Sequence, residues 1–407
     1  MLDFSLVFLL MYGPKLGFMG FDFISAASVF ALVRYWRYVG SSIYTPPMLY
    51  GLLATAYVHL ALTANGVLDA WWLMRMPRYL VNYLACFVVA YAVCGKASVE
   101  RLVLYVFYAA GLHAGIVLLQ VFSPEFDSVL AATLGNKQQS EIRFSGLVRG
   151  LAEPSLIMAA SAALGYYCYV RRIIGLWHYL VIAAAIFSAC LVMGRAGLYL
   201  GLTVTILAVG YDQIRRGRLL VISMAFSVTM LVLLLFVNFI DDLPFDPLVI
   251  AGLKHGVEPF INLFGKGEFS SSSMDDFENH RFVFHNVNTL QYLFGTGLYG
   301  RGDPGTYLPT DIAYAHMFSA FGLCGVALFV LATVASVGPY RPEMGRWRYI
   351  YVVQILLTVA VLSMNVKQTV LLTRHITGMV ALLYGAMYYA KRYSAASSQQ
   401  TLTVTTH

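Results

Sequence analysis

Arginine side chains stand at the boundaries of long apolar stretches in this sequence, a placement that suits anion binding. In the segment LVMGRAGLYLGL, Arg195 interrupts two apolar stretches at the position of a tight hairpin. An arginine there costs several kcal/mol unless it is solvated or paired. Two interpretations fit. The side chain reaches the water interface, or it binds an anion beside a helix N-terminus, where backbone N–H groups add to the positive field.

A second group of charged residues precedes another apolar stretch, in RFSGLVRGLAEPSLIMAA. Pro154 suits the first position of a helix, so we expect a helix to begin there with Glu153 just before it. A carboxylate at a helix N-terminus is stabilising by itself, so capping accounts for Glu153 about as well as catalysis does. The combination of Arg143, Arg149, an acid and a glycine turn at one membrane face is more informative, and it indicates a candidate site.

Further cations share helix faces toward the C-terminus. Arg281 and His285 are four residues apart, which places them on one face of an expected helix that ends at the glycines from Gly295 onward. A surface helix with a solvated arginine is the alternative. Lys367 and Arg374 are seven residues apart in VKQTVLLTRH, so both point along one stripe of the last helix and favour a path for an anion.

The stretch TDIAYAHMFSAFGLCGVALFVL adds an acid and an imidazole at the mouth of an apolar run. Asp311 is a candidate catalytic group, and a cap for the helix that follows is the alternative. His316 lies about a turn deeper, where a lone histidine is more often a packed polar residue than a catalyst. Glu153, Asp311 and His316 are therefore the candidate general bases, and the sequence does not rank them.

The elements that carry these residues are predicted to be membrane-spanning helices. The chain has 407 residues, of which 59% are hydrophobic and 12% charged, whereas a soluble protein keeps about 25% charged. Continuous apolar runs of about 20 residues are typical of transmembrane helices and exclude a β-barrel, whose strands alternate. We predict an all-α, polytopic integral membrane protein with about 12 spans. They cover residues 3–19, 22–39, 48–66, 78–95, 102–122, 154–170, 176–193, 196–212, 219–239, 313–336, 347–364 and 368–390.

Basic residues give the orientation of the predicted spans. Arginine or lysine follows every even-numbered span, and the positive-inside rule places these loops in the cytoplasm. The formal net charge of +7 is thereby explained by topology, without a nucleic-acid partner. The basic residues concerned are Arg34, Arg37, Lys96, Arg101, Arg171, Arg172, Arg215, Arg216, Arg218, Arg341, Arg346, Arg348, Lys391 and Arg392.

The opposite, outer face receives the remaining loops, and four regions follow. Residues 1–239 hold the earlier spans with an outer loop at 123–153, 240–312 form one large outer loop, 313–392 hold the last spans, and 393–407 form a cytoplasmic tail. In the large loop, LVIAGL and VEPFINLFG are amphipathic enough to lie on the membrane surface. The five cysteines have no CxxC spacing, which predicts neither a disulfide framework nor a metal site.

Taken together, at least five cations outside the cytoplasmic loops are predicted to converge on one membrane leaflet, at the outer face. Their natural partner is a diphosphate, which carries about two negative charges and accepts paired arginine hydrogen bonds. The apolar helices provide an environment for a lipid tail on the same molecule. The residues therefore favour a lipid diphosphate as the substrate class.

Four segments, in their order along the chain, resemble motifs of the bacterial O-antigen polymerase and O-antigen ligase superfamily. RFSGLVRGLAEPS is similar to the family's R-x-S/T-G…E/N-P segment, and MGRAGLYLGL is similar to its S/G-R hairpin. HRFVFHNVNTLQYLFGTGLYG is similar to the R…(P)LxGxG helix of its large periplasmic loop, and TDIAYAHMFSAFGLCG to its closing helix. Polymerases often show S/T-D-x-x-Y where ligases have His-Asn. Thr310, Asp311 and Tyr314 resemble the polymerase pattern, and His316 is displaced from the ligase position.

The resemblance implies a GT-C-like fold and a metal-independent glycosyltransferase without a cofactor, in the bacterial inner membrane with its active site facing the periplasm. Its partners would be undecaprenyl-diphosphate-linked oligosaccharides and membrane lipids, with a chain-length regulator protein as a further one to consider. Arg143, Arg195 and Arg281, with Arg149 next, would stabilise the leaving diphosphate. An O-antigen ligase that acts on lipid A core and a lipid-linked glycan transporter or flippase remain the alternatives.

Overall fold

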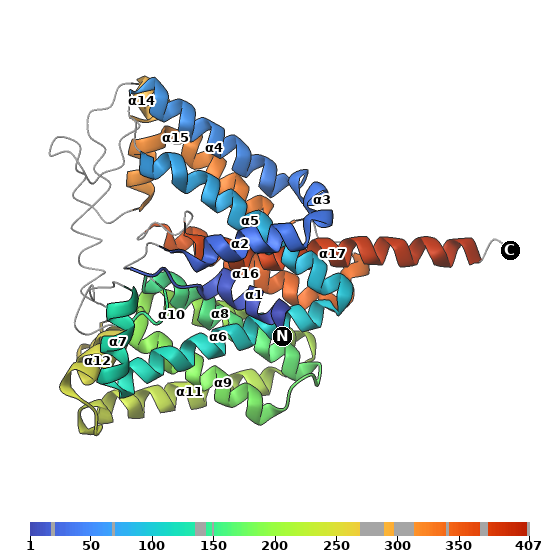
Figure 1. The fold of residues 1–407 in the computed structure, drawn as a ribbon. Coiled ribbons are helices and arrows are strands. Elements are labelled where there is room, and N and C mark those ends of the chain that lie inside the picture. The colour runs from blue at the N-terminus through green and yellow to red at the C-terminus, as the bar shows by residue number, and fades with distance from the viewer. Residues whose placement is uncertain are drawn as a thin grey trace. The chain divides into compact units, whose positions relative to one another are not determined.

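The computed structural model describes residues 1–17, 21–66, 70–134, 144–148, 150–268, 289–296, 313–338, 342–366 and 373–404. Every regular element within these ranges is a helix, which confirms the all-α class for the described part of the chain (Figure 1). Seven of the described helices are long and apolar enough to cross a membrane, so the chain is a polytopic membrane protein by length and composition. These candidate spans are Pro46–Ala64, Met74–Lys96, Val99–Phe122, Leu176–Met193, Arg195–Arg215, Ala313–Ala335 and Gly345–Met364.

The helices follow the predicted spans in chain order, and each predicted span overlaps a helix. Because seven described helices meet both criteria of length and hydropathy, the predicted number of spans is not established. The elements are α1 (Leu2–Tyr12), α2 (Phe23–Arg34), η1 (Trp36–Tyr38), α3 (Val39–Ile43), α4 (Pro46–Ala64), α5 (Ala70–Lys96), α6 (Val99–Phe122), α7 (Pro124–Leu134), α8 (Ala152–Val170), α9 (Leu176–Met193), α10 (Arg195–Arg215), α11 (Leu219–Phe239), η2 (Ile240–Asp242), α12 (Pro247–Lys266), α14 (Thr289–Phe294), α15 (Ala313–Ala335), η3 (Pro342–Trp347), α16 (Arg348–Met364) and α17 (Arg374–Val404).

The first two predicted spans are shorter than the sequence indicates. α1 has 11 residues and α2 has 12, so each is about 17 Å long at 1.5 Å per residue, against a hydrocarbon core of about 30 Å. α1 ends at Tyr12 because Gly13 and Pro14 follow it. Proline cannot donate a backbone hydrogen bond, and it disfavours helical geometry in the residue before it.

The predicted outer loops and the predicted tail also contain helices. α7 lies within the predicted loop 123–153, and α12 joins LVIAGL and VEPFINLFG of the large loop into one helix with Pro259 inside it. α17 continues to Val404, so the predicted tail is helical from residue 393 to that point.

The chain divides into two compact units, which are considered one at a time. The first unit comprises Met1–Met11, Ile24–Leu102 and Phe277–His407, and the second comprises Tyr12–Phe23 and Val103–Asp276. In the first unit α17 packs along α5, α4 packs along α15, and α16 packs against α17.

Helix α15 of the first unit is broken at Gly322, whose φ of 62° and ψ of −173° are not helical. The short helix α14 packs against α15 at this break. The hydroxyl of Tyr57, on α4, donates to the carbonyl of Phe321 at 2.8 Å and to that of Phe294 at 3.1 Å. These bonds join α4 to the end of α14 and to α15 at the break.

The second unit is built around α8, whose residues are buried from Ala152 to Cys168. Helix α10 packs along α8. A Cβ on Gly201 would lie 2.5 Å from the Ala159 Cβ, and a Cβ on Gly197 would clash with the Ala152 carbonyl. Small residues of this kind let two helix backbones approach closely. The close contacts at Gly197 and Gly201 fix where α10 lies along α8, and therefore where the first residue of α10 lies.

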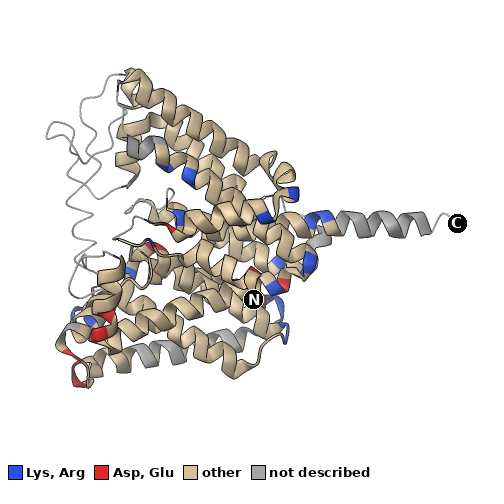
Figure 2. Ribbon diagram, viewed as in Figure 1, with Lys and Arg blue, Asp and Glu red and all other residues tan. Residues whose placement is uncertain are grey.

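Basic residues gather at the helix ends that the sequence predicts to be cytoplasmic, and most charges in Figure 2 lie at helix ends. In the first unit the Lys96 ammonium lies 4.6 Å from the Tyr35 ring centroid, and Arg346 forms a 2.8 Å ion pair with Glu100. In the second unit Arg216 pairs with Asp212 at 2.9 Å near the end of α10. Both units therefore have a basic end that fits the predicted orientation.

Candidate functional site

The candidate site lies in the second unit, at the ends of α8, α9 and α10 opposite to their basic ends. A single residue, Gly194, joins α9 to α10 in an extended conformation, and Arg195 is the first residue of α10. A Cβ on Gly194 would lie 2.7 Å from the Leu151 carbonyl carbon and 2.8 Å from the Ala152 nitrogen. Glycine is required here because the hairpin touches the backbone at the start of α8.

Arg195 is buried and paired with a carboxylate of the same chain. Its side chain is 9% exposed, and its Nη1 atom forms an ion pair with Glu258 of α12. Nη1 also donates to the carbonyl of His255 at 3.4 Å. The sequence analysis weighed solvation against binding of an external anion. The structure shows a third arrangement, in which the guanidinium forms an ion pair with a carboxylate of the same chain, that of Glu258.

Helix α12 is held against this end of the unit by further contacts. The Tyr199 hydroxyl, one turn after Arg195, donates to the Gly256 carbonyl at 2.5 Å. A Cβ on Gly256 would lie 2.7 Å from the Leu191 carbonyl oxygen, so α12 also touches the end of α9. The His255 Nδ1 atom lies 3.8 Å from the Glu258 carboxylate. Together, these contacts place α12 over the start of α10.

Glu153 lies in the first turn of α8 and is 7% exposed. Gly150 has a φ of +114°, and a Cβ there would lie 2.9 Å from Glu153 Oε2. The glycine turn that the sequence analysis noted is thus needed both for its backbone conformation and for the room it leaves to the carboxylate. Because Gly194 touches the backbone of Leu151 and Ala152, Glu153 and Arg195 belong to the same end of the unit.

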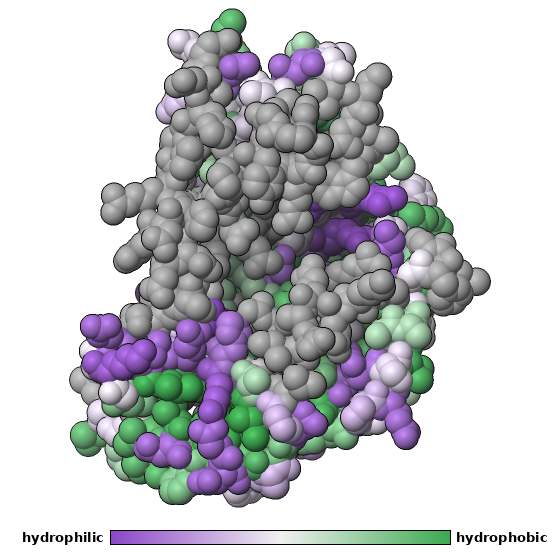
Figure 3. Space-filling view, turned by 90° about the vertical axis from the view of Figure 1, so that its left-hand side faces the viewer, coloured by the Kyte–Doolittle hydropathy of each residue, from purple (hydrophilic) through white to green (hydrophobic). Residues whose placement is uncertain are grey.

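Hydrogen bonds also hold the segment before α8 at this end of the second unit. The Gly146 amide donates to Gln120 Oε1 at 2.7 Å, and the Phe144 amide donates to the Val192 carbonyl at 3.3 Å, two residues before Gly194. Figure 3 views the molecule from the side on which this end lies, and hydrophilic residues gather in its lower part. Exposed acids and bases of η2 and α12, including the ion pair between Lys254 and Asp241, belong to this end.

Glu258, His255 and Tyr199 are residues that the sequence analysis did not select. Glu258 is the one acid in VEPFINLFG and precedes Pro259, as Glu153 precedes Pro154. The same acid–proline pair also occurs at Asp246–Pro247 and Asp303–Pro304, so it did not single out Glu258. The pairing itself depends on how α12 folds back onto α10, which no local pattern reveals.

Two predicted site residues lie in the first unit. His316 is half-buried in the first turn of α15. Arg374 is the first residue of α17, and its carbonyl accepts a 3.0 Å hydrogen bond from Asn82 of α5. Next to His316, the Tyr314 hydroxyl donates to the Leu362 carbonyl at 3.0 Å, and Met317 Sδ accepts a hydrogen bond from Asn365 Nδ2 at 3.4 Å. Both bonds join the start of α15 to the end of α16.

The remaining predicted residues lie outside the described part of the chain: Arg143, Arg149, Arg281, His285, Asp311 and Lys367. Their convergence with Arg195 stays a prediction. Within the described ranges, no three histidine, cysteine, aspartate or glutamate side chains are grouped so that they could hold a metal ion.

Comparison with known proteins does not assign a family. No protein-family model matches the chain, and no curated protein matches it significantly. The resemblance noted from the sequence therefore rests on its motifs. Of these, MGRAGLYLGL is wholly described, and it forms the hairpin that holds Arg195.

Proposed function

We propose that this chain is a surface-polysaccharide polymerase of the bacterial inner membrane. It would transfer a growing undecaprenyl-diphosphate-linked glycan onto an undecaprenyl-diphosphate-linked repeat unit at the periplasmic face, without a metal. The observation that carries the proposal is Arg195. Its guanidinium is buried at the end of the second unit that also holds Glu153, and it pairs with the carboxylate of Glu258 on α12.

In the proposed reaction an acceptor hydroxyl attacks the anomeric carbon of the donor glycan. The bond between that carbon and the diphosphate oxygen breaks, and its electron pair leaves with the lipid diphosphate. The hydroxyl proton passes to a base, for which Glu153, Asp311 and His316 are the candidates. Because the leaving diphosphate gains charge, the main catalytic need is a fixed cation in a poorly hydrated place.

Glu258 has a specific role in this proposal. A carboxylate carries one negative charge, whereas a diphosphate carries about two and accepts the planar guanidinium fork from several oxygens. The diphosphate therefore competes for Arg195, and Glu258 holds the guanidinium in place until it arrives. Without an internal partner, the buried arginine would be destabilising in the free protein.

A lipid-linked glycan transporter is the second candidate, because α15 is broken at Gly322 and broken helices are typical of transporters. In transporters the break points its helix ends at a charged substrate. The described groups at this break include the hydroxyls of Tyr57 and Thr296 and the backbone of Leu293, Gly295 and Ala320. None of these carries a charge, so the break favours a packing role for α14.

The experiment that separates these functions uses purified protein and lipid-linked repeat units of defined structure. The polymerase proposal predicts chains of two or more repeats when lipid A core is absent. A ligase would transfer glycan only when lipid A core is added. A transporter would move the lipid across vesicles and leave every repeat unit unextended. Either of these last two results would refute the proposal.

A further inference from the structure

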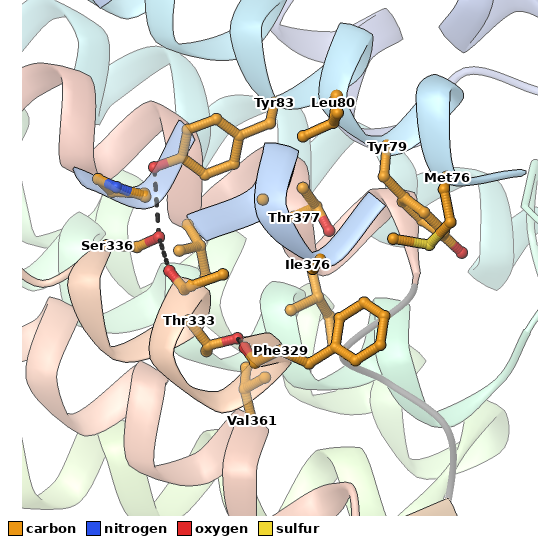
Figure 4. Close-up of a pocket in the computed structure, with 15 residues that line it drawn as sticks. Met76, Tyr79, Leu80, Tyr83, Phe329, Thr333, Ser336, Val361, Ile376 and Thr377 are labelled. Carbon is orange, nitrogen blue, oxygen red and sulfur yellow. Dashed lines mark hydrogen bonds between the residues drawn. The ribbon is translucent and has the colours of Figure 1, made fainter. Parts of the chain in front are cut away.

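Charge distinguishes the Arg195 end of the second unit from the pocket of the first unit, which is shown in Figure 4. None of the described residues that line this pocket is charged, and its Tyr83 hydroxyl and Ser336 Oγ lie 3.2 Å apart in a hydrogen bond of their own. The Arg195 end, in contrast, also carries the side chains of Lys254 and His255 on α12. An anionic ligand is therefore expected at the Arg195 end and not in the pocket.

Two nitrogen atoms of different residues approach one carboxylate oxygen at this end. Arg195 Nη1 forms its ion pair with Glu258 Oε2, and His255 Nδ1 lies 3.8 Å from the same oxygen. His255 and Glu258 are three residues apart on α12, so their side chains share a face of the helix. The position of Glu258 Oε2 is therefore one at which an anionic oxygen meets both a guanidinium and an imidazole.

The carboxylate of Glu258 can give up this position to another anion. The side chains of Glu258 and His255 are 27% and 24% exposed, whereas that of Arg195 is 9% exposed. The two residues of α12 thus form the more accessible part of the cluster, and we expect a ligand to approach from their side. Because Glu258 is partly solvated, its carboxylate can turn toward water when a ligand oxygen takes its place.

The other titratable groups near His255 come from the elements that pack against α12, which are α9, α10, α11 and η2. Helix α11 has no acidic, basic or histidine residue, and the histidine of α9 lies in its first turn, at the basic end of the unit. The groups that these elements bring to the Arg195 end are Cys190 of α9, Arg195 and Tyr199 of α10, and Asp241 and Asp242 of η2. Among all the groups named, a histidine is the kind whose ordinary pKa, about 6.5, lies near neutral pH.

We propose that His255 is a second ligand of the lipid diphosphate, and that it takes up a proton when the diphosphate displaces Glu258 from Arg195. The reason is charge balance. Arg195 supplies one positive charge, whereas a diphosphate carries about two negative charges, and a protonated imidazole supplies the second positive charge. The proton comes from the solvent and stays on the ring, and no covalent bond of the ligand changes. The inference rests on the proposed function, to which it adds a binding residue.

Proton uptake gives diphosphate binding a pH dependence of defined sign. A bound dianion stabilises the protonated imidazole, so binding is tighter below the ordinary histidine pKa of about 6.5 and weaker above it. One additional charge-assisted contact should make the affinity about 5- to 10-fold higher at about pH 5.5 than at about pH 8. Near pH 7, binding should take up a fraction of a proton.

The test uses isothermal titration calorimetry of the purified full-length protein in detergent. The probe is a diphosphate diester with a short prenyl chain on one phosphate and N-acetylglucosamine on the other, whose two charges are the same at both pH values. Titration in two buffers of different ionisation enthalpy measures the protons taken up on binding. We expect wild type to show both the uptake and the stated pH dependence. Binding without proton uptake would overturn the proposal, and this measurement requires no variant.

Two adjacent residues of α12 provide a matched pair of variants. His255→Gln should abolish the proton uptake and the pH dependence, because glutamine does not titrate. Lys254→Gln removes a full positive charge from the neighbouring residue, and it should keep both properties because Lys254 pairs with Asp241. A pH dependence that persists in a folded His255→Gln protein would assign the proton to another group and refute the proposal.

Arg195→Ala separates this inference from the proposed function. Probe binding that requires Arg195 but does not change with pH would refute the role of His255 and leave the proposed diphosphate site in place. Equal affinity of wild type and Arg195→Ala for the probe at both pH values would contradict the diphosphate site itself, and this inference with it.

Discussion

The ion pair between Arg195 and Glu258 is the most consequential residue-scale feature of the molecule. Arg195 is 9% exposed and Glu258 is 27% exposed, so the pair is largely withdrawn from water. Removing one partner of a buried pair leaves an uncompensated charge, which costs about 3–5 kcal/mol in fully buried cases. The same helix offers a contrast, because Lys254 and Asp241 form a pair whose side chains are 42% and 68% exposed.

Neutralising Glu258 should therefore destabilise the protein more than neutralising Lys254. We expect Glu258→Gln to lower the free energy of unfolding by about 1–3 kcal/mol, less than the fully buried limit because Glu258 is partly solvated. Lys254→Gln should change it by less than about 1 kcal/mol, because exposed pairs contribute little. Thermal unfolding of the two variants in detergent measures the difference. Equal shifts would show that the Arg195 pair is no more important than a surface contact.

At the scale of elements, the position of Arg195 depends on glycines. Gly194 and Gly197 allow α10 to touch the start of α8, where any side chain would clash with backbone atoms. Gly210 lies on the same helix, and a Cβ there would meet nothing within 4 Å. The chain thus provides an internal control for the effect of a single added methyl group.

Gly197→Ala should separate α10 from α8, whereas Gly210→Ala should be tolerated. We expect a loss of about 1–3 kcal/mol for Gly197→Ala from overpacking. Gly210→Ala should be neutral or stabilising by up to about 1 kcal/mol, because alanine favours the helix. Melting temperatures of both variants test this. A Gly197→Ala protein as stable as wild type would mean that the helices do not meet as closely as described.

The helices at the predicted spans could be located from the sequence because each of these spans is an apolar run bounded by polar or turn residues. The hairpin at Gly194 and Arg195 was predictable for the same reason. The lengths of α1 and α2 were overestimated; for α1, hydropathy continues through Gly13 and Pro14 while the helix cannot. The partner of Arg195 was missed because Glu258 is 63 residues away in the chain. Long-range pairing of this kind leaves no periodic signal.

At the scale of the whole molecule, the prediction to test is the membrane orientation, in which one set of helix ends is cytoplasmic and the other is outside. Within the second unit, Gly175 lies in the exposed turn between α8 and α9, on the basic side. Asp242 lies exposed in η2, on the side of Arg195. The orientation therefore predicts that Gly175 faces the cytoplasm and that Asp242 faces the outside.

Cysteine labelling in intact cells tests the orientation. A membrane-impermeant maleimide should label Asp242→Cys from outside and leave Gly175→Cys unlabelled until the cells are opened. The native cysteines are buried, or intermediate in the case of Cys324, so wild type gives the background. The reverse pattern would place Arg195 at the cytoplasmic face and would contradict the predicted orientation.

The most direct test of the central claim is the rate at which purified protein extends lipid-linked repeat units when Arg195 is changed. We expect Arg195→Ala to slow extension by about 100-fold or more, the effect of removing one fixed donor to a developing anion. Arg195→Lys should recover part of the rate, since it restores the charge without the planar fork. Glu258→Gln should retain activity, because Glu258 only holds the guanidinium. If a folded Arg195→Ala protein extends chains at the wild-type rate, Arg195 does not bind the diphosphate and the account is wrong.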